Sequence, residues 1–119
     1  MKSGRLIYLT MLLVFLTSCS EKKVTDIDGN VYETVRIGKQ VWMAENLSVT
    51  RFRNGDPIPQ VRDSAEWIAL KESAYCYYDN DESNGDIHGA LYNWYAVNDP
   101  RGLAPEGWRV PSNDDWKEL

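Results

Sequence analysis

The sequence predicts one small domain built from short strands and short helices, preceded by an export signal. Alternating apolar residues and turn residues dominate the stretch from 24 to 47, which is typical of strands joined by hairpins. From residue 63 onward, capping residues precede spaced apolar residues, which is typical of short helices. About a hundred residues follow the signal, which is enough for a single domain.

The beginning of the chain has the layout of a secretory signal. Lys2 and Arg5 form a short basic region, and residues 6–16 form an apolar run without a charge. This run is too short to cross a hydrocarbon core of about 30 Å. The run ends three residues before Cys19, with two small residues between, an arrangement that resembles the lipobox of bacterial lipoproteins.

The lipobox resemblance implies a cut before Cys19, a signal peptide at residues 1–18 and a lipid on the Cys19 thiol. Residues 19–23 would then be a tether, and several acyl chains would hold the protein firmly at a membrane. Ser20 stands where some bacteria use Asp to retain lipoproteins in the inner membrane, so we expect the outer membrane. The alternatives are an ordinary secretory signal with an incidental cysteine, or an uncleaved N-terminal anchor.

Charge and cysteine content narrow the function further. Removal of the signal would leave 11 basic residues (13 minus 2) against 18 acidic ones, a formal charge of −7. Such a chain repels phosphate backbones, so nucleic acid is not an expected partner. With Cys19 lipidated, Cys76 has no partner for an internal disulfide, and we expect it to be a small buried apolar residue. His88, the only histidine, has no evident link to Cys76.

A strand meander is predicted between Val24 and Leu47. Residues 28–30 supply a turn between a strand at 24–27 and a strand at 31–37. In the second strand, Val31, Val35 and Ile37 lie on one face, which we expect to be half-buried. Gly38 and Lys39 fit a two-residue hairpin turn before a returning strand at 40–43, and residues 44–47 end that element.

The middle of the chain alternates between loops and short elements. Residues 51–62 contain two prolines and mixed charges, and we expect a surface loop. Asp63, followed three residues later by Glu66, resembles a capping box and predicts a helix with Trp67 and Leu70 directed inward.

A strand is predicted at residues 74–78, which are short and aromatic. Leu91, Trp94 and Tyr95 recur with helical spacing, so a helix is expected over residues 90–97. The turn residues at 99–102 end it.

The last residues predict the beginning of a helix. Ser112 can cap it, Asp114 and Asp115 complement its dipole, and Trp116 and Leu119 begin an apolar face. The sequence stops after about two turns without a C-terminal cap, so we expect a domain that is truncated at its C-terminus.

An acidic segment invites a calcium hypothesis. Asp79, Asp81, Asn84 and Asp86 could supply several of the six to eight oxygens that calcium needs. The EF-hand spacing fails, however, because the glycine falls one place late and Ala90 stands where a bidentate Glu should be. A solvated acidic turn is therefore the favoured interpretation, and no other cofactor is expected.

Three segments together resemble a known family. They are Asp28-Gly29-Asn30-Val31-Tyr32 with Ile37-Gly38-Lys39-Gln40-Val41-Trp42-Met43-Ala44-Glu45-Asn46-Leu47, Gly89-Ala90-Leu91-Tyr92-Asn93-Trp94-Tyr95-Ala96-Val97, and Leu103-Ala104-Pro105-Glu106-Gly107-Trp108-Arg109-Val110-Pro111-Ser112 with Asp115-Trp116. In this order they are similar to the Fibrobacter succinogenes major paralogous domain, found in exported proteins and lipoproteins of the Bacteroidetes and Fibrobacter groups. The resemblance covers residues 24–119.

The family resemblance implies an α+β domain with a C-type-lectin-like fold, a curled antiparallel sheet and short helices. The segment 108–112 is also similar to a motif of formylglycine-generating enzymes, but those relatives use cysteines in a later part that this chain lacks. Asp114 and Asp115 are adjacent at a helix start, which suits caps better than an acid–base pair. No catalytic residue is therefore predicted.

The expected function is a non-catalytic, lipid-anchored envelope module that binds polysaccharide or another envelope component, including a protein. Aromatic rings can stack on sugar faces, although in a domain this small most of them should belong to the core. The alternatives are an enzyme of the formylglycine-generating type and an inactive fragment.

Overall fold

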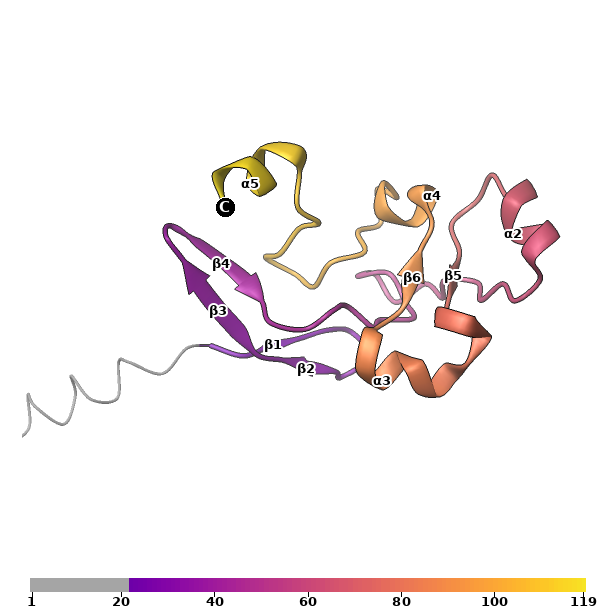
Figure 1. Cartoon of the computed structure of the whole chain (residues 1–119), viewed down its shortest axis with the longest axis horizontal. Coiled ribbons are helices and arrows are strands. Elements are labelled where there is room, and N and C mark those ends of the chain that lie inside the picture. The colour runs from indigo at the N-terminus through magenta and orange to yellow at the C-terminus, as the bar shows by residue number, and fades with distance from the viewer. Residues whose placement is uncertain (1–21) are drawn as a thin grey trace, which may run out of the picture.

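A computed structural model describes residues 22–119, which form a small α+β domain of short antiparallel strand pairs and short helices (Figure 1). This confirms the coarse fold class. In chain order the elements are β1 (Val24–Thr25), β2 (Val31–Tyr32), β3 (Thr34–Ile37), β4 (Gln40–Met43), α2 (Ser64–Ala69), β5 (Tyr75–Cys76), η1 (Tyr78–Asn80), η2 (Glu82–Asn84), α3 (Gly85–His88), β6 (Leu91–Tyr92), α4 (Trp94–Val97) and α5 (Asn113–Glu118). The pairs are β1–β2, β3–β4 and β5–β6.

The turn between β1 and β2 is organised around the buried carboxylate of Asp26. It accepts hydrogen bonds from the main-chain N–H groups of Asp28 (2.9 Å) and Asn30 (3.0 Å) and from the Asn30 side chain (2.9 Å). The Tyr32 hydroxyl donates a fourth bond of 2.6 Å. The predicted turn is thus confirmed, and a short polar side chain holds it together.

The strand predicted over residues 31–37 is divided at Glu33 into β2 and β3, which pair with different partners. The prediction that Val31, Val35 and Ile37 form the half-buried face is wrong, because all three are exposed. Tyr32, on the opposite face, is buried instead. Its hydroxyl has hydrogen-bond partners inside, and the ring brings more apolar surface to the core than a valine would.

The β3–β4 hairpin agrees with the prediction. Gly38 has a φ of +61°, as the two-residue turn requires, and Val35 lies opposite Trp42 in the register. In Figure 1 the hairpin extends away from the rest of the domain, and α5 lies beside it. The Trp42 and Trp116 rings link the two elements, with centroids 4.8 Å apart.

The core lies where the prediction placed a surface loop. Phe52 and Ile58, within residues 51–62, are buried, together with Val49, Tyr75 and Leu103. The loop folds back on itself, because the N–H of Ile58 donates to the carbonyl of Thr50 (2.9 Å) and that of Phe52 to Asp56 (2.8 Å). Prolines and charges in the sequence marked it as irregular, but irregular backbone can still carry core side chains when its polar groups are paired.

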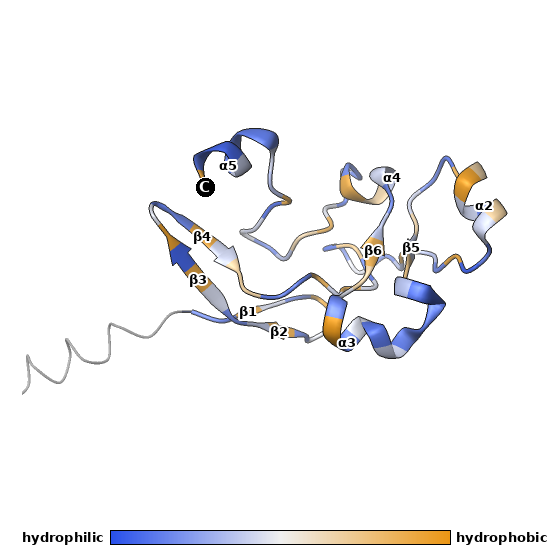
Figure 2. Cartoon of the chain, in the orientation of Figure 1, coloured by the Kyte–Doolittle hydropathy of each residue, from blue (hydrophilic) through white to orange (hydrophobic). Residues whose placement is uncertain are grey.

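Helix α2 begins as predicted. Asp63 accepts a hydrogen bond from the N–H of Glu66 (2.9 Å). Trp67 and Leu70 are half-buried, and no residue of α2 is fully buried. Figure 2 shows apolar residues on this outlying helix, where Ile68 is largely exposed.

The helix predicted over residues 90–97 is wrong in its first half. Leu91 and Tyr92 form β6 and pair with β5, and α4 begins only after Asn93. Asn93 caps α4 by accepting from the N–H of Ala96 (2.9 Å). Leu91 and Trp94 are both exposed. Within residues 22–119 there is no helix with the length and apolar character needed to span a bilayer.

A close main-chain contact joins two of the family-like segments. Gly89 has a φ of +69°, and a Cβ built there would lie 2.5 Å from the carbonyl oxygen of Leu47. The next N–H, that of Ala90, donates to this same carbonyl (2.9 Å). Glycine is therefore required by both the backbone angle and the space.

Candidate functional site

The sequence predicted a lipid-attachment site and a possible calcium site. The lipid-attachment residue, Cys19, lies outside the described residues. Of the predicted calcium ligands, Asp79 lies in η1, Asn84 in η2 and Asp86 in α3, and Asp81 caps η2 at its N-terminus. The Asp81 carboxylate accepts from the Ser83 N–H and hydroxyl, bonds that lower its pKa. The Asn84 amide donates to the carbonyl of Tyr78 (2.8 Å).

These contacts turn two of the four predicted calcium ligands toward their own loop. In the part of the chain that the structure describes, no three His, Cys, Asp or Glu side chains are grouped as metal ligands would be. Calcium binding stays a prediction without a built site behind it.

The residues considered for catalysis have structural roles. Ser112 caps α5 as predicted, and it does so through a capping box with Asp115, which also pairs with Arg109. Hydrogen bonds from Arg109 and Ser112 hold the pKa of Asp115 well below its usual range. Cys76 is half-buried rather than buried as predicted, and burial raises the pKa of its thiol. A raised pKa keeps the thiol protonated, which disfavours a nucleophilic role.

The most exposed tryptophan lines a depression of about 500 Å³ beside α4, here called the Trp94 pocket. Trp94 is 71% exposed, and Tyr95 packs edge-on against it with ring centroids 5.4 Å apart. The pocket is lined by Pro57, Pro59, Lys71, Glu72, Ser73, Trp94, Tyr95, Asn98, Asp99, Pro100 and Arg101. Tryptophan is usually well covered in folded proteins, so this exposure needs a reason.

Helix α4 is held in place from beneath, which fixes the direction of Trp94. Ala96, two residues later, is fully buried. The side chain of Asn93 accepts from the N–H of Ala74 (3.1 Å) and donates to the carbonyl of Glu72 (2.7 Å). With Ala96 inward and Asn93 tied to residues 72–74, Trp94 is left at the surface.

A rigid ion pair forms one side of the Trp94 pocket. Arg101 donates to both carboxylate oxygens of Asp99, at 2.9 and 2.8 Å, and Ser73 donates to the same carboxylate (2.9 Å). These bonds hold the pKa of Asp99 well below its usual range. The Arg101 guanidinium also lies 4.1 Å from the ring centroid of Phe52 in the core. The charged groups are thus positioned before any ligand arrives.

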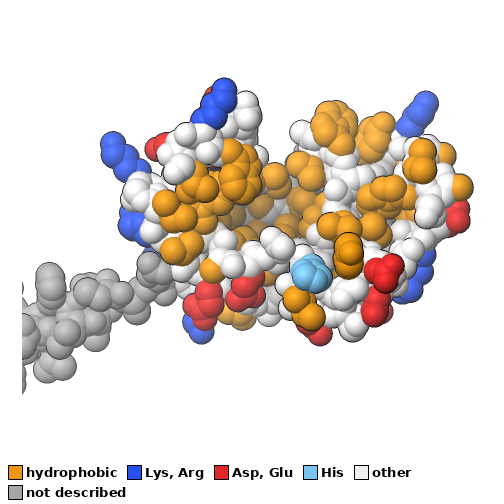
Figure 3. Space-filling view, viewed as in Figure 1, with side chains coloured by type: hydrophobic (Ala, Val, Ile, Leu, Met, Phe, Trp, Pro, Cys, Tyr) orange, Lys and Arg blue, Asp and Glu red, His pale blue; other side chains and the backbone are white. Residues whose placement is uncertain are grey.

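A second surface, here called the tryptophan groove, runs between the β3–β4 hairpin and residues 103–111. It has a volume of about 600 Å³ and includes Trp42, Trp108 and Trp116. Figure 3 shows hydrophobic side chains gathered around a hollow in the middle of this face, with charged side chains mostly at its margin. Arg109 and Asp115, which line the groove, already neutralise each other.

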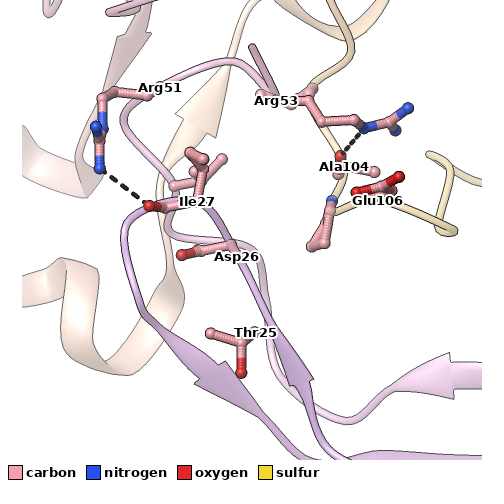
Figure 4. Close-up of a pocket in the computed structure, with 10 residues that line it drawn as sticks. Thr25, Asp26, Ile27, Arg51, Arg53, Ala104 and Glu106 are labelled. Carbon is pink, nitrogen blue, oxygen red and sulfur yellow. Dashed lines mark hydrogen bonds between the residues drawn. The ribbon is translucent and has the colours of Figure 1, made fainter. Parts of the chain in front are cut away.

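A third, smaller pocket of about 170 Å³ lies between the β1–β2 turn and residues 103–106 (Figure 4). Both of its arginines donate hydrogen bonds to main-chain carbonyl groups. Arg51 donates to the carbonyl of Ile27 (3.0 Å) and pairs with Asp28, and Arg53 donates to the carbonyl of Ala104 (3.0 Å). These contacts tie the turn and the C-terminal segment to the core loop, and they give this pocket a structural role.

Sequence reasoning missed the Trp94 pocket for an identifiable reason. Trp94 was used only as one of the residues that predict a helix over residues 90–97, and the segment 99–102 was treated only as a helix break. The available signal was Asn93, a good capping residue directly before Trp94, which would have begun the helix later and turned the tryptophan outward.

Comparison with known proteins gives one match. Residues 35–119 fit the profile of the Fibrobacter succinogenes major domain. The matched range contains the second and third family-like segments in full and the 37–47 part of the first. Neither a curated protein nor a solved structure matches the chain.

Proposed function

This chain belongs to the Fibrobacter succinogenes major domain family, and we propose that it is a non-catalytic glycan-binding module held at a bacterial envelope membrane by a lipid on Cys19. The observation that carries the proposal is the Trp94 pocket. A largely exposed indole stands there beside a pre-positioned ion pair.

The chemistry of the pocket suits a sugar. One face of many sugar rings consists of C–H groups and can lie on an aromatic ring, while the hydroxyl groups need donors and acceptors around the edge. Trp94 offers the ring. Arg101 and Lys71 offer donors, and Glu72 and Asn98 offer acceptors within the same pocket. A few polar groups around an apolar platform are typical of small-ligand sites.

A neutral glycan fits the charge balance of this pocket. Two cationic residues, Lys71 and Arg101, and two acidic residues, Glu72 and Asp99, line it. Because Arg101 and Asp99 are already paired, an anionic sugar would gain little and would meet the charge of Glu72. The bonds between Arg101, Asp99 and Ser73 also reduce the ordering that binding has to impose.

The lipid anchor would strengthen weak sugar binding. A single open pocket of this kind gives modest affinity, but many copies tethered to one membrane can engage a repeating polysaccharide together. Removal of residues 1–18, the tether at 19–23 and an outer-membrane location are parts of the same proposal. Antiparallel strand pairs and short helices also support the finer fold assignment, a C-type-lectin-like domain, which an experimental structure would test.

The experiment has two stages. First, the purified full chain in detergent is applied to an array of neutral and acidic bacterial and plant glycans. Second, a soluble oligosaccharide from the strongest signal is titrated calorimetrically against wild type, Trp94→Ala and Trp116→Ala. Trp116 is the matched control, because it is also an exposed tryptophan (58%) but lies in the tryptophan groove.

We expect neutral glycans to give the signals and Trp94→Ala to weaken binding about tenfold or more, equivalent to roughly 1.4 kcal/mol. Trp116→Ala should bind like wild type. Silence across the array, or equal binding by wild type and Trp94→Ala, would contradict the proposal.

A further inference from the structure

One edge of the β3–β4 hairpin carries main-chain groups without a partner. The N–H of Ala44 donates to the carbonyl of Glu33 (2.8 Å), and antiparallel pairs alternate between bonded and non-bonded positions. Because Ala44 is at a bonded position, Trp42, two residues earlier, is bonded to β3 as well. Val41 and Met43 are at the non-bonded positions, and their N–H and C=O groups point away from β3. Within the described part of the chain, no hydrogen bond reaches these four groups on the outer edge of β4.

The outer edge of β4 lacks the features that usually protect an exposed strand. The strand Gln40–Met43 contains no proline and no charged residue, and it has no bulge in its register. The other edge of the hairpin is different. β3 contains the charged Arg36, and the hydroxyl of Thr34 is bonded to the carbonyl of Lys22 (2.7 Å). An unprotected edge of this kind is a template for pairing with another strand.

Apolar side chains on the β3 strand of the hairpin are exposed as well. Val35 and Ile37 share a face with Trp42 and are 39% and 43% exposed. On the same face, Trp42 packs on Trp116, and the Gln40 side chain donates to the carbonyl of Asp115 (3.1 Å) and to the Glu118 carboxylate (3.2 Å). Helix α5 thus covers the β4 side of this face and leaves the β3 side open, and the tryptophan groove runs along β4. A two-stranded hairpin is marginal by itself in water, and additional strands stabilise it.

We propose that the outer edge of β4 pairs with β4 of a second copy of this chain, in an antiparallel arrangement with its two-fold axis at Trp42. Val41 of each copy then lies opposite Met43 of the other, and the four unpaired main-chain groups of each strand are satisfied. The two hairpins become one four-stranded sheet. This self-association goes beyond glycan binding and does not depend on it.

Charge complementarity selects both the second copy and the register. In the arrangement centred on Trp42, Lys39, in the turn just before β4, lies opposite Glu45 of the second copy, in the bend just after β4, and Glu45 lies opposite Lys39. The symmetric registers centred on Val41 or Met43 satisfy the direction of the hydrogen bonds as well, but they place Lys39 opposite an apolar residue. Opposite charges facing each other across strands stabilise a pairing, and like charges weaken it.

The same register brings aromatic rings together. Trp42 meets Trp42 of the second copy at a non-hydrogen-bonded position, where side chains lie closest, at roughly 4.5 Å between Cα atoms. Trp116 of each chain already packs on its own Trp42. The two-fold axis thus gathers four tryptophans into one cluster, and buried tryptophan clusters contribute strongly to interfaces.

The test uses charge reversal in the full chain, followed by sedimentation velocity in density-matched detergent. Lys39→Glu alone and Glu45→Lys alone place like charges opposite each other in two positions. Each should weaken self-association roughly tenfold, since two exposed pairs are lost and replaced by repulsion. An equimolar mixture of the two single variants restores opposite charges and should associate as wild type does. Lys71→Glu, a reversal in the Trp94 pocket, is the matched control and should leave association unchanged.

A second variant tests the strand pairing itself. Val41→Pro removes an N–H that β3 does not use, so the hairpin can persist while the edge loses a donor. We expect it to abolish dimerisation, and Trp94→Ala to leave dimerisation intact even as it lowers glycan binding. A wild-type chain that stays monomeric at every soluble concentration would overturn the proposal. So would a dimer that is indifferent to both charge reversals, or capture of a glycan or foreign peptide by this edge in place of a second copy.

Discussion

Removal of the Tyr32 hydroxyl has a predictable effect on the free energy of unfolding. The hydroxyl donates to the Asp26 carboxylate (2.6 Å) and accepts from the Ser48 N–H (3.0 Å), and the Tyr32 side chain is almost completely buried. Tyr32→Phe removes a bond to a charged acceptor, worth about 1.5–3 kcal/mol, and leaves the Ser48 N–H without this partner, at a cost of about 1–3 kcal/mol. Partial relaxation lowers the sum, so we expect a loss of about 2–4 kcal/mol.

The assay is urea unfolding followed by tryptophan fluorescence, with Tyr78→Phe as the control. Tyr78 is 62% exposed, so its substitution should change the free energy of unfolding by less than about 0.5 kcal/mol. For a domain of this size, the Tyr32→Phe loss corresponds to a melting temperature lower by roughly 10–25 °C. A Tyr32→Phe protein as stable as the control would refute the account of the β1–β2 turn.

The same hydroxyl predicts a pH dependence. Burial, and then the bond to Asp26, raises the pKa of Tyr32 to about 12. An unfolded tyrosine titrates near 10, so the folded state favours the protonated form. The stabilising contribution is therefore complete below about pH 10 and is lost as the pH rises toward 12. The difference in unfolding free energy between wild type and Tyr32→Phe should narrow over that range, and a constant difference would contradict the assignment.

Three further predictions concern single positions. Gly89→Ala should lower the unfolding free energy by more than about 2 kcal/mol, because a left-handed angle and the Leu47 carbonyl both oppose a Cβ; chemical denaturation measures this. Ser112→Ala should shorten α5 and lower the free energy of unfolding by about 1 kcal/mol, because the Asp115 N–H loses the Ser112 hydroxyl as its hydrogen-bond acceptor (3.2 Å). Hydrogen exchange should show a faster rate at the Asp115 amide. Mass spectrometry of the mature protein should find an acylated Cys19 at its N-terminus, and a chain that still carries Met1 would exclude lipoprotein processing.

The parts of the fold that were predicted correctly are those whose conformation is determined by residues close together in the sequence. The β1–β2 turn, the Gly38 hairpin and the caps at Asp63 and Ser112 each depend on one or two residues with a fixed preference. Such signals operate within a few residues along the chain. They are therefore visible without knowledge of the tertiary structure.

The wrong predictions concern residues whose burial is determined by contacts with distant segments of the chain. Val35 has strand periodicity, but which face is buried depends on Tyr32, whose hydroxyl finds Asp26 and Ser48 inside. Residues 51–62 look like a surface loop, yet Phe52 is fully buried under Arg101 from a segment almost fifty positions later. Neither contact leaves a periodic trace in the sequence, so propensity alone could not find it.

For the candidate site, the sequence indicated the types of residue but not their arrangement. Stacking of aromatic rings on sugars was considered, but no aromatic residue was assigned to a binding site, and Trp94 contributed only to the prediction of a helix over residues 90–97. In the structure, Leu91 lies in β6 and pairs with Cys76, and the helix begins at Trp94, four residues later than predicted. The ion pair of Asp99 and Arg101 became part of a site only when α4 and the segment at 71–73 were placed beside it.

The most direct test of glycan binding is the indole N–H spectrum of the full chain, which has five tryptophans, during titration with a neutral oligosaccharide from the array. Two-dimensional ¹H–¹⁵N spectra resolve each indole, and Trp94→Phe identifies the signal of interest. We expect the Trp94 signal to shift in proportion to the bound fraction, while those of Trp42 and Trp116 stay in place. A shift of the Trp42 or Trp116 signal with a stationary Trp94 signal would move the site to the tryptophan groove and contradict the account.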